Sequence, residues 1–80
     1  MVKLIIKNKI PELKDQYDKI ESELNMKIIP TRKILFIFEN MDIMVPDNAE
    51  IIIDGFNCKI GDKNIDLRKN KFLESIPQVY

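Results

Sequence analysis

Carboxylates are the only side chains in this sequence whose types and spacing suggest catalytic chemistry. Asp47, which follows Pro46, and Asp54 partly match a metal-dependent nuclease pattern of Pro-Asp, then an acid, one residue and a lysine. Such carboxylates hold Mg²⁺ or serve as acid and base. The pattern is incomplete, because the triplet that ends at Lys59 begins with Asn57. We therefore interpret both aspartates as turn residues.

Other catalytic and metal-binding chemistry is missing from the composition. The chain has no histidine and one cysteine, so it lacks Ser-His-Asp and Cys-His nucleophiles, histidine zinc sites and single-chain thiolate clusters. The two glycines, Gly55 and Gly61, are both needed by turns, so there is no glycine-rich phosphate-binding loop. We predict a protein that is not an enzyme and that uses no cofactor or metal.

The lone cysteine, Cys58, is predicted to be a small buried residue on an apolar strand face. It cannot form an intrachain disulfide, which favours a reducing, cytoplasmic location. The N-terminal residues are too charged for a signal peptide, and no apolar run approaches the length of a membrane span, so we expect neither. The abundance of Ile, Lys and Asn suggests AT-rich coding DNA, as in a low-GC bacterium, an archaeon or a virus of either.

Charge is balanced overall but unevenly distributed. The chain carries 13 basic and 13 acidic residues, yet positions 34–58 contain acids and no base. This acidic block suits a basic partner or the imitation of nucleic-acid phosphate, but we interpret it as solvated surface. Basic residues gather in two groups, formed by Lys3, Lys7, Lys9, Arg32 and Lys33 and by Lys63, Arg68, Lys69 and Lys71. They make a nucleic-acid-associated protein an alternative hypothesis.

The clearest structural signal is a pair of two-residue turns whose positions place the apolar residues of three strands on the same side. Asp54-Gly55 and Gly61-Asp62 suit two-residue hairpin loops, because Gly and Asp tolerate positive φ. The sequence therefore predicts a three-stranded meander. Its apolar side is made of Ala49, Ile51, Ile53, Phe56, Cys58, Ile60, Ile65 and Leu67.

These loop positions also predict a register. The first loop places Glu50 opposite Lys59, which is a favourable cross-strand charge pair. The second loop places Cys58 opposite Ile65.

The rest of the chain predicts one helix and further strands. Residues 2–7 alternate as a strand, and the apolar spacing then changes to 3, 4, 3, 4 from Ile10 to Leu24, which is typical of a helix from about Pro11 to Leu24. Residues 33–39 are apolar on both sides, as in a strand covered on both faces. Residues 41–45 form a short strand, and residues 69–75 suit one or two helical turns.

The fold class is therefore α+β, in a single domain over residues 1–80 with a tail of uncertain structure at 68–80. We expect a mainly antiparallel sheet, β-α-β followed by the meander, with one amphipathic helix packed on one face. The other face carries Ile5, Ile52 and either Leu35 and Ile37 or Ile34, Phe36 and Phe38. It is covered by the tail, or it binds a second copy or a partner protein. Candidate interaction residues are Ile5, Leu35, Ile37, Ile52, Phe72, Ile76, Val79 and Tyr80.

The favoured function is that of a small intracellular, non-catalytic protein-interaction module, such as an accessory or inhibitory protein of a virus or mobile element. It would bind a partner protein or self-associate, without a membrane, and a lysine at Ile5 or Ile52 would abolish association. One alternative, nucleic-acid binding, predicts an affinity that falls steeply with salt. The other, a carboxylate- and Mg²⁺-dependent enzyme with a site between subunits, predicts a thermal stability that changes with metal.

Overall fold

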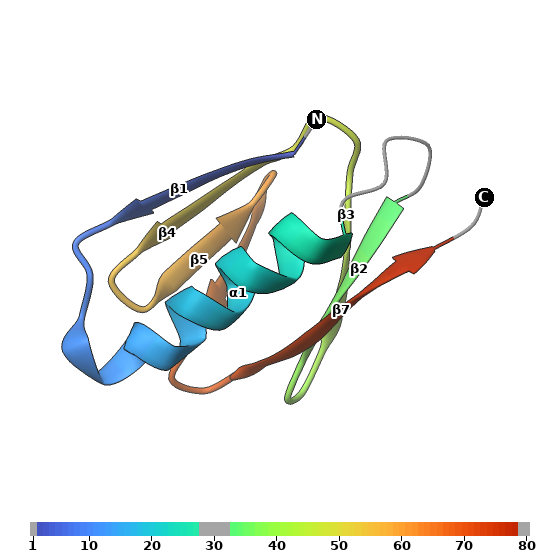
Figure 1. The fold of residues 1–80 in the computed structure, drawn as a ribbon. Coiled ribbons are helices and arrows are strands. Elements are labelled where there is room, and N and C mark those ends of the chain that lie inside the picture. The colour runs from blue at the N-terminus through green and yellow to red at the C-terminus, as the bar shows by residue number, and fades with distance from the viewer. Residues whose placement is uncertain (1, 28–32, 79–80) are drawn as a thin grey trace.

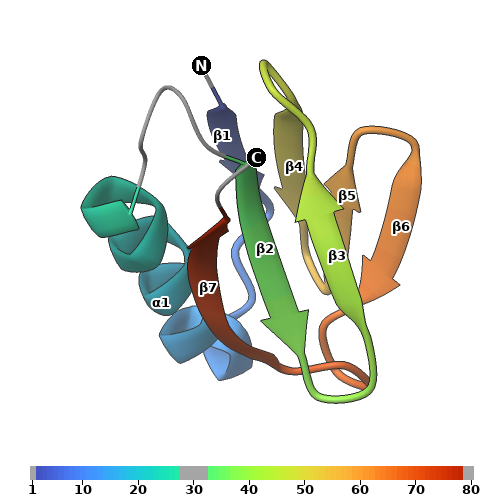
Figure 2. The same cartoon turned by 90° about the vertical axis from the view of Figure 1, so that its right-hand side faces the viewer.

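Two β-sheets face each other in this protein, and the helix α1 lies along one side of both (Figures 1 and 2). The computed structural model describes residues 2–27 and 33–78. In chain order the elements are β1 (Lys3–Lys7), the 3₁₀ turn η1 (Pro11–Leu13), α1 (Lys14–Lys27), β2 (Lys33–Phe38), β3 (Asp42–Val45), β4 (Glu50–Asp54), β5 (Asn57–Ile60), β6 (Lys63–Asp66) and β7 (Phe72–Gln78).

The described strands divide between two sheets. Sheet A has the order β1-β4-β5-β6, and sheet B has the order β3-β2-β7. Strand β1 runs parallel to β4, and all other neighbouring strands are antiparallel. Figure 2 shows sheet B in front of sheet A, with α1 beside β7. The α+β class, the meander and the packed helix are confirmed, but sequence analysis had treated the strands as one sheet.

Strand β2 shows why the second sheet is needed. Ile34, Phe36 and Phe38 are buried, whereas Leu35 and Ile37 between them are only half-buried. Alternate residues of a strand point to opposite faces, so one side of β2 packs on the core. The expectation that β2 would be covered on both sides is therefore met on one side only, within the described part of the chain.

The helix follows its predicted apolar stripe. It begins with the 3₁₀ turn at Pro11–Leu13 and continues as α1 to Lys27, three residues beyond the predicted end at Leu24. Ile10, at the start of the stripe, is half-buried. The other stripe residues are buried in the core, and they are Leu13, Tyr17, Ile20 and Leu24.

The β5–β6 hairpin has the predicted register. Gly61-Asp62 forms its loop, and Cys58 lies opposite Ile65. With the exception of Phe56, the residues predicted for the apolar side of the meander are buried: Ala49, Ile51, Ile53, Cys58, Ile60, Ile65 and Leu67.

The β4–β5 hairpin has a different register from the predicted one. Its loop is Gly55-Phe56, and Lys59 lies opposite Ile52 instead of Glu50. Gly55, with a φ of 62°, takes the first loop position, where a glycine adopts positive φ without strain. In the predicted loop, Asp54-Gly55, this glycine takes the second position. The resulting shift of two residues keeps the apolar side of the strands but moves Phe56 into the exposed loop.

The tail forms the strand β7, and not the helical turns expected over residues 69–75. It pairs with β2, so it extends sheet B and does not cover the outer face of that sheet. Pro77 lies opposite Ile34. A proline is accepted there because β7 is at the edge of the sheet, where one side of the strand has no ladder to complete.

An aromatic cluster joins β2 to β7 inside the core. The ring of Phe72 lies 5.0 Å from that of Phe36 and 5.5 Å from that of Phe38, both edge to face. Edge-to-face pairs at such distances add about 0.5–1.5 kcal/mol each beyond the burial of their area. The C-terminal strand is therefore held by its inward side chains.

Candidate functional site

The structure separates the predicted interaction residues into two groups on opposite sides of the molecule. Ile5 and Ile52 are neighbours on the outer face of sheet A. Leu35, Ile37 and Ile76 share the outer face of sheet B. All five are half-buried.

The remaining candidates do not join either surface. Phe72 is only 1% exposed and packs in the aromatic cluster, because its position in β7 directs it inward. Val79 and Tyr80 lie outside the described residues.

The outer face of sheet B carries an apolar row across its three strands. Leu35 of the central strand lies opposite Met44 on one side and Ile76 on the other. Near Ile37 the register shifts, and the bulge adds Leu73. Met44 and Leu73 are both 44% exposed. We refer to these five residues, Leu35, Ile37, Met44, Leu73 and Ile76, as the sheet B face.

Charges lie at both ends of the sheet B face. Asp42 and Glu74 are exposed on either side of Ile37, and Lys33 lies opposite Gln78 at the other end. The apolar row therefore separates an acidic end from a basic one.

The outer face of sheet A is more polar. Lys3 and Glu50 lie opposite each other on β1 and β4, as do Lys7 and Asp54. These charge pairs enclose the two isoleucines. Lys3 and Lys7 of the predicted basic group are thus interleaved with acids, whereas Lys33 lies on sheet B. Arg32 lies outside the described residues.

In the second basic group, Arg68 packs on an aromatic ring. Its guanidinium lies 3.6 Å from the centre of the Phe56 ring, a distance suited to a cation–π contact. Its Nε also lies 3.7 Å from an Asp66 carboxylate oxygen. This contact gives Phe56 a partner outside the core.

The side chains considered for catalysis are Cys58, Asp47 and Asp54, and Asp47 lies in the turn between β3 and β4. Cys58 is fully buried, and this burial raises the pKa of its thiol to about 12, so the thiol stays protonated at neutral pH. Asp54 ends β4, where its carboxylate accepts a hydrogen bond of 2.6 Å from Asn8. Across the described ranges, no group of three or more Cys, Asp or Glu side chains is placed to hold a metal ion.

The helix α1 is bonded to the edge of β7 by polar side chains. Gln16 Oε1 accepts the main-chain N–H of Phe72 at 2.8 Å. Glu23 Oε2 accepts both the N–H and the hydroxyl of Ser75, at 3.1 and 3.2 Å. Tyr17 donates its hydroxyl to the Gly55 carbonyl oxygen at 2.6 Å, which ties the same helix to the β4–β5 loop.

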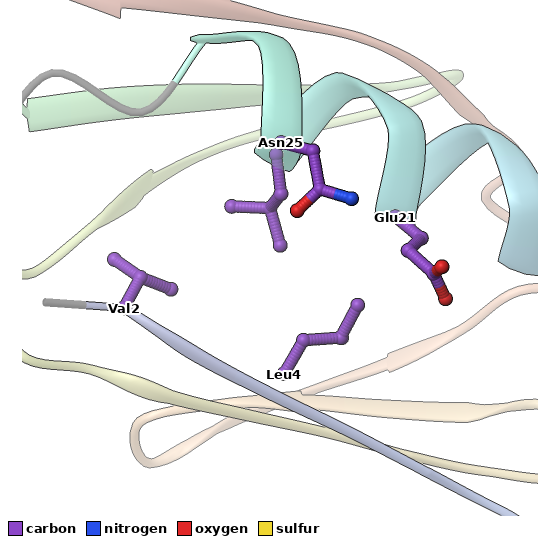
Figure 3. Close-up of a pocket in the computed structure, with 5 residues that line it drawn as sticks. Val2, Leu4, Glu21 and Asn25 are labelled. Carbon is purple, nitrogen blue, oxygen red and sulfur yellow. The ribbon is translucent and has the colours of Figure 1, made fainter.

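On its other side, α1 is separated from β1 by a groove of about 310 Å³. Val2 and Leu4 project from the β1 side, and Glu21 and Asn25 project from α1 towards them (Figure 3). Leu24 completes the lining. We refer to this space as the helix–strand groove. The sequence does not predict this groove, because Glu21 and Asn25 lie outside the apolar stripe and no local signal places them beside β1.

No helix of the described residues has the length and hydropathy needed to cross a lipid bilayer. No protein-family model, curated protein or solved structure matches this chain.

Proposed function

We propose that this protein is a small interaction module that works by binding another polypeptide, without catalysis, through the sheet B face. The observation that carries the proposal is the apolar row from Met44 through Leu35 to Ile76 on the outer surface. A contiguous apolar surface with a polar border is typical of a protein contact site. A lone buried thiol is compatible with action in the cytoplasm.

We propose a second copy of the chain as the occupant, because the charges of this surface are self-complementary. A twofold axis that lies in the plane of the contact, perpendicular to the strands, would place Leu35 of one copy against Leu35 of the other at the centre. It would bring Asp42 and Glu74 of one copy towards Lys33 of the other. A twofold contact uses the same patch on both copies, so opposite charges at its two ends favour this alignment.

The test is the molar mass in solution, measured by light scattering over a concentration series. We expect a dimer for the natural sequence and a monomer for Leu35→Lys, which buries a charge at the centre of the contact. Ile52→Lys is the matched control, because Ile52 is similarly half-buried but lies on the outer face of sheet A. Ile52 is among the residues predicted for association, but it lies outside the contact proposed here, so this variant should leave the dimer intact.

A monomeric natural protein at high concentration would contradict the proposal. A dimer lost on Ile52→Lys but kept on Leu35→Lys would contradict it as well, since the contact would then use sheet A. Circular dichroism of both variants separates loss of the dimer from loss of the fold.

The acidic end provides a second test. The double variant Asp42→Lys/Glu74→Lys gives both ends of the sheet B face the same sign, so the aligned copies would repel each other. We expect weaker dimerisation that recovers partly at high salt, because salt screens exposed charges. An unchanged dimer would exclude the charge alignment proposed here.

A further inference from the structure

The open edge of β1 has the main-chain groups that recognise another strand. Lys3 N–H bonds to the Ala49 carbonyl at 3.0 Å, and Gly55 N–H bonds to the Lys7 carbonyl at 3.3 Å. In a parallel pair, alternate residues direct their N–H and C=O to the same neighbour. Lys3, Ile5 and Lys7 therefore face β4, and the intervening residues face away from it.

Those intervening residues, Leu4 and Ile6, direct their main-chain groups to the side of β1 that is away from β4. Among the described residues, no hydrogen bond joins the N–H or C=O of either residue to another element. Unpaired groups in a row at a sheet edge form a template for an added strand.

The helix–strand groove lies along this same edge. Val2, just before β1, and Leu4 within it contribute one apolar wall, and Leu24 contributes another from α1. Its volume of about 310 Å³ is at the lower end of the range of roughly 300–1,000 Å³ typical of ligand pockets. A strand added at β1 would direct every second side chain into this space, because successive side chains alternate between faces.

The charge on the α1 side of the groove determines which added strands would bind more tightly. Asp18 is paired with Lys14, Nζ to Oδ2 at 3.3 Å, so its charge is offset. Glu21 is exposed at the groove and forms no salt bridge with the described residues. The groove therefore has one uncompensated negative charge on its rim.

From these observations we infer that the helix–strand groove binds an extended peptide segment of a partner protein by strand addition to β1. The segment has apolar side chains at alternate positions and a lysine or arginine that reaches Glu21. Main-chain bonding to Leu4 and Ile6 provides affinity, while the groove and the carboxylate provide selection. This surface is distinct from the sheet B face.

The probe is a capped heptapeptide of alternating threonine and valine, with lysine in place of the central valine, so that the lysine lies on the side that faces the groove and Glu21. We expect it to shift the amide signals of Leu4 and Ile6 in a nitrogen-15 NMR titration and to slow their hydrogen exchange. A peptide with glutamate in place of the lysine should bind about three- to tenfold more weakly, the size expected of an exposed charge pair exchanged for repulsion.

Two controls separate strand addition from unspecific contact. A peptide with N-methylated amides on the side that faces β1 keeps its side chains but loses those donors, and it should not bind. Glu21→Lys should reverse the preference between the lysine and glutamate peptides. Glu39→Lys makes the same change of charge at an exposed turn after β2 and should leave the preference unaltered.

The inference is wrong if none of the peptides shifts the Leu4 and Ile6 signals, or if the N-methylated peptide binds equally well. It is also wrong if those signals move with protein concentration alone, since a second copy would then pair at β1. The titration is repeated in Leu35→Lys, where binding should persist. Failure of the dimer proposal and failure of this one are thus distinguishable.

Discussion

The two strands that flank α1, β7 and β1, differ in whether the main chain of the strand is hydrogen-bonded to the helix. At β7, Gln16 and Glu23 of the helix accept main-chain N–H groups of Phe72 and Ser75, so this edge is bonded to the helix. At β1, the same helix leaves a groove, and the main-chain groups that face it remain unpaired by the described residues. A single helix thus accepts hydrogen bonds from one sheet edge and, within the described residues, forms none with the main chain of the other.

The spacing of side chains around α1 produces this difference. Gln16 and Glu23 are seven residues apart, and therefore lie on one line along the helix, next to β7. Glu21 and Asn25, four residues apart, lie on another line, next to β1. The apolar stripe separates the two lines. The helix therefore directs hydrogen-bond acceptors towards β7 of sheet B and exposed side chains towards β1 of sheet A.

The largest effect on stability should come from removing the ring of Phe72, which packs β7 against the core. Phe72→Ala leaves a cavity beside Phe36 and Phe38, and we expect a loss of about 3–5 kcal/mol in the free energy of unfolding, measured in urea. Met26→Ala, at an exposed residue of α1 outside the sheet B face, is the control and should cost less than about 0.5 kcal/mol. Similar losses in both variants would mean that β7 is not held by its inward side chain.

A direct comparison of the two edges uses two glutamates of one helix. Glu23→Ala removes the acceptor of the Ser75 N–H and hydroxyl, and we expect it to cost about 2 kcal/mol, within the range for hydrogen bonds to charged groups. Glu21→Ala should change the stability by less than about 0.5 kcal/mol, since this residue is exposed. Equal losses on chemical denaturation would remove the distinction between the edges.

The ionisation of the buried Cys58 thiol tests whether the core around it excludes water. Burial raises its pKa from 9.0 to about 12, so the folded state disfavours the thiolate. This contribution to stability is therefore complete below pH 9 and is lost as the pH rises from about 9 to about 12. The decline, measured by urea unfolding at each pH, should be smaller in Cys58→Ala. An identical decline in both proteins would show that water reaches the thiol in the folded state.

The smallest effect is local and concerns hydrogen exchange. The amides of Leu4 and Ile6 should exchange faster than those of Phe72 and Ser75, whose N–H groups are bonded to α1. The amide of Ile5, which faces β4, provides the control within the same strand. Protection of Leu4 and Ile6 equal to that of Ile5 would show that the β1 edge is already occupied.

Much of the local structure was predictable, because it depends on short-range periodicity. The helix stripe from Leu13 to Leu24 and the inward residues of the meander are buried as predicted. The β5–β6 register also followed from Gly61 and its neighbour. The β4–β5 register was wrong, because Asp-Gly is compatible with two loop positions and only the strand pairing distinguishes them.

The candidate site was only partly predictable. Alternation identified Ile52 as outward, but on the apolar strand β2 it allowed either Leu35 and Ile37 or Ile34, Phe36 and Phe38 to be outward. It also does not say which sheets Leu35 and Ile52 join. They proved to lie on opposite sides of the molecule. The prediction of helical turns in the tail was wrong, because its short apolar run suits either a helical turn or a strand. Pairing with β2 makes it a strand.

The sequence by itself determined which side of each element is apolar and where its glycines make the chain turn, since both depend on neighbouring residues. Only the tertiary structure decided that β7 meets the acceptors of α1 and that β1 does not. That decision rests on contacts such as the one between Glu23 and Ser75, which are 52 positions apart, and no local pattern specifies which edges a helix will face.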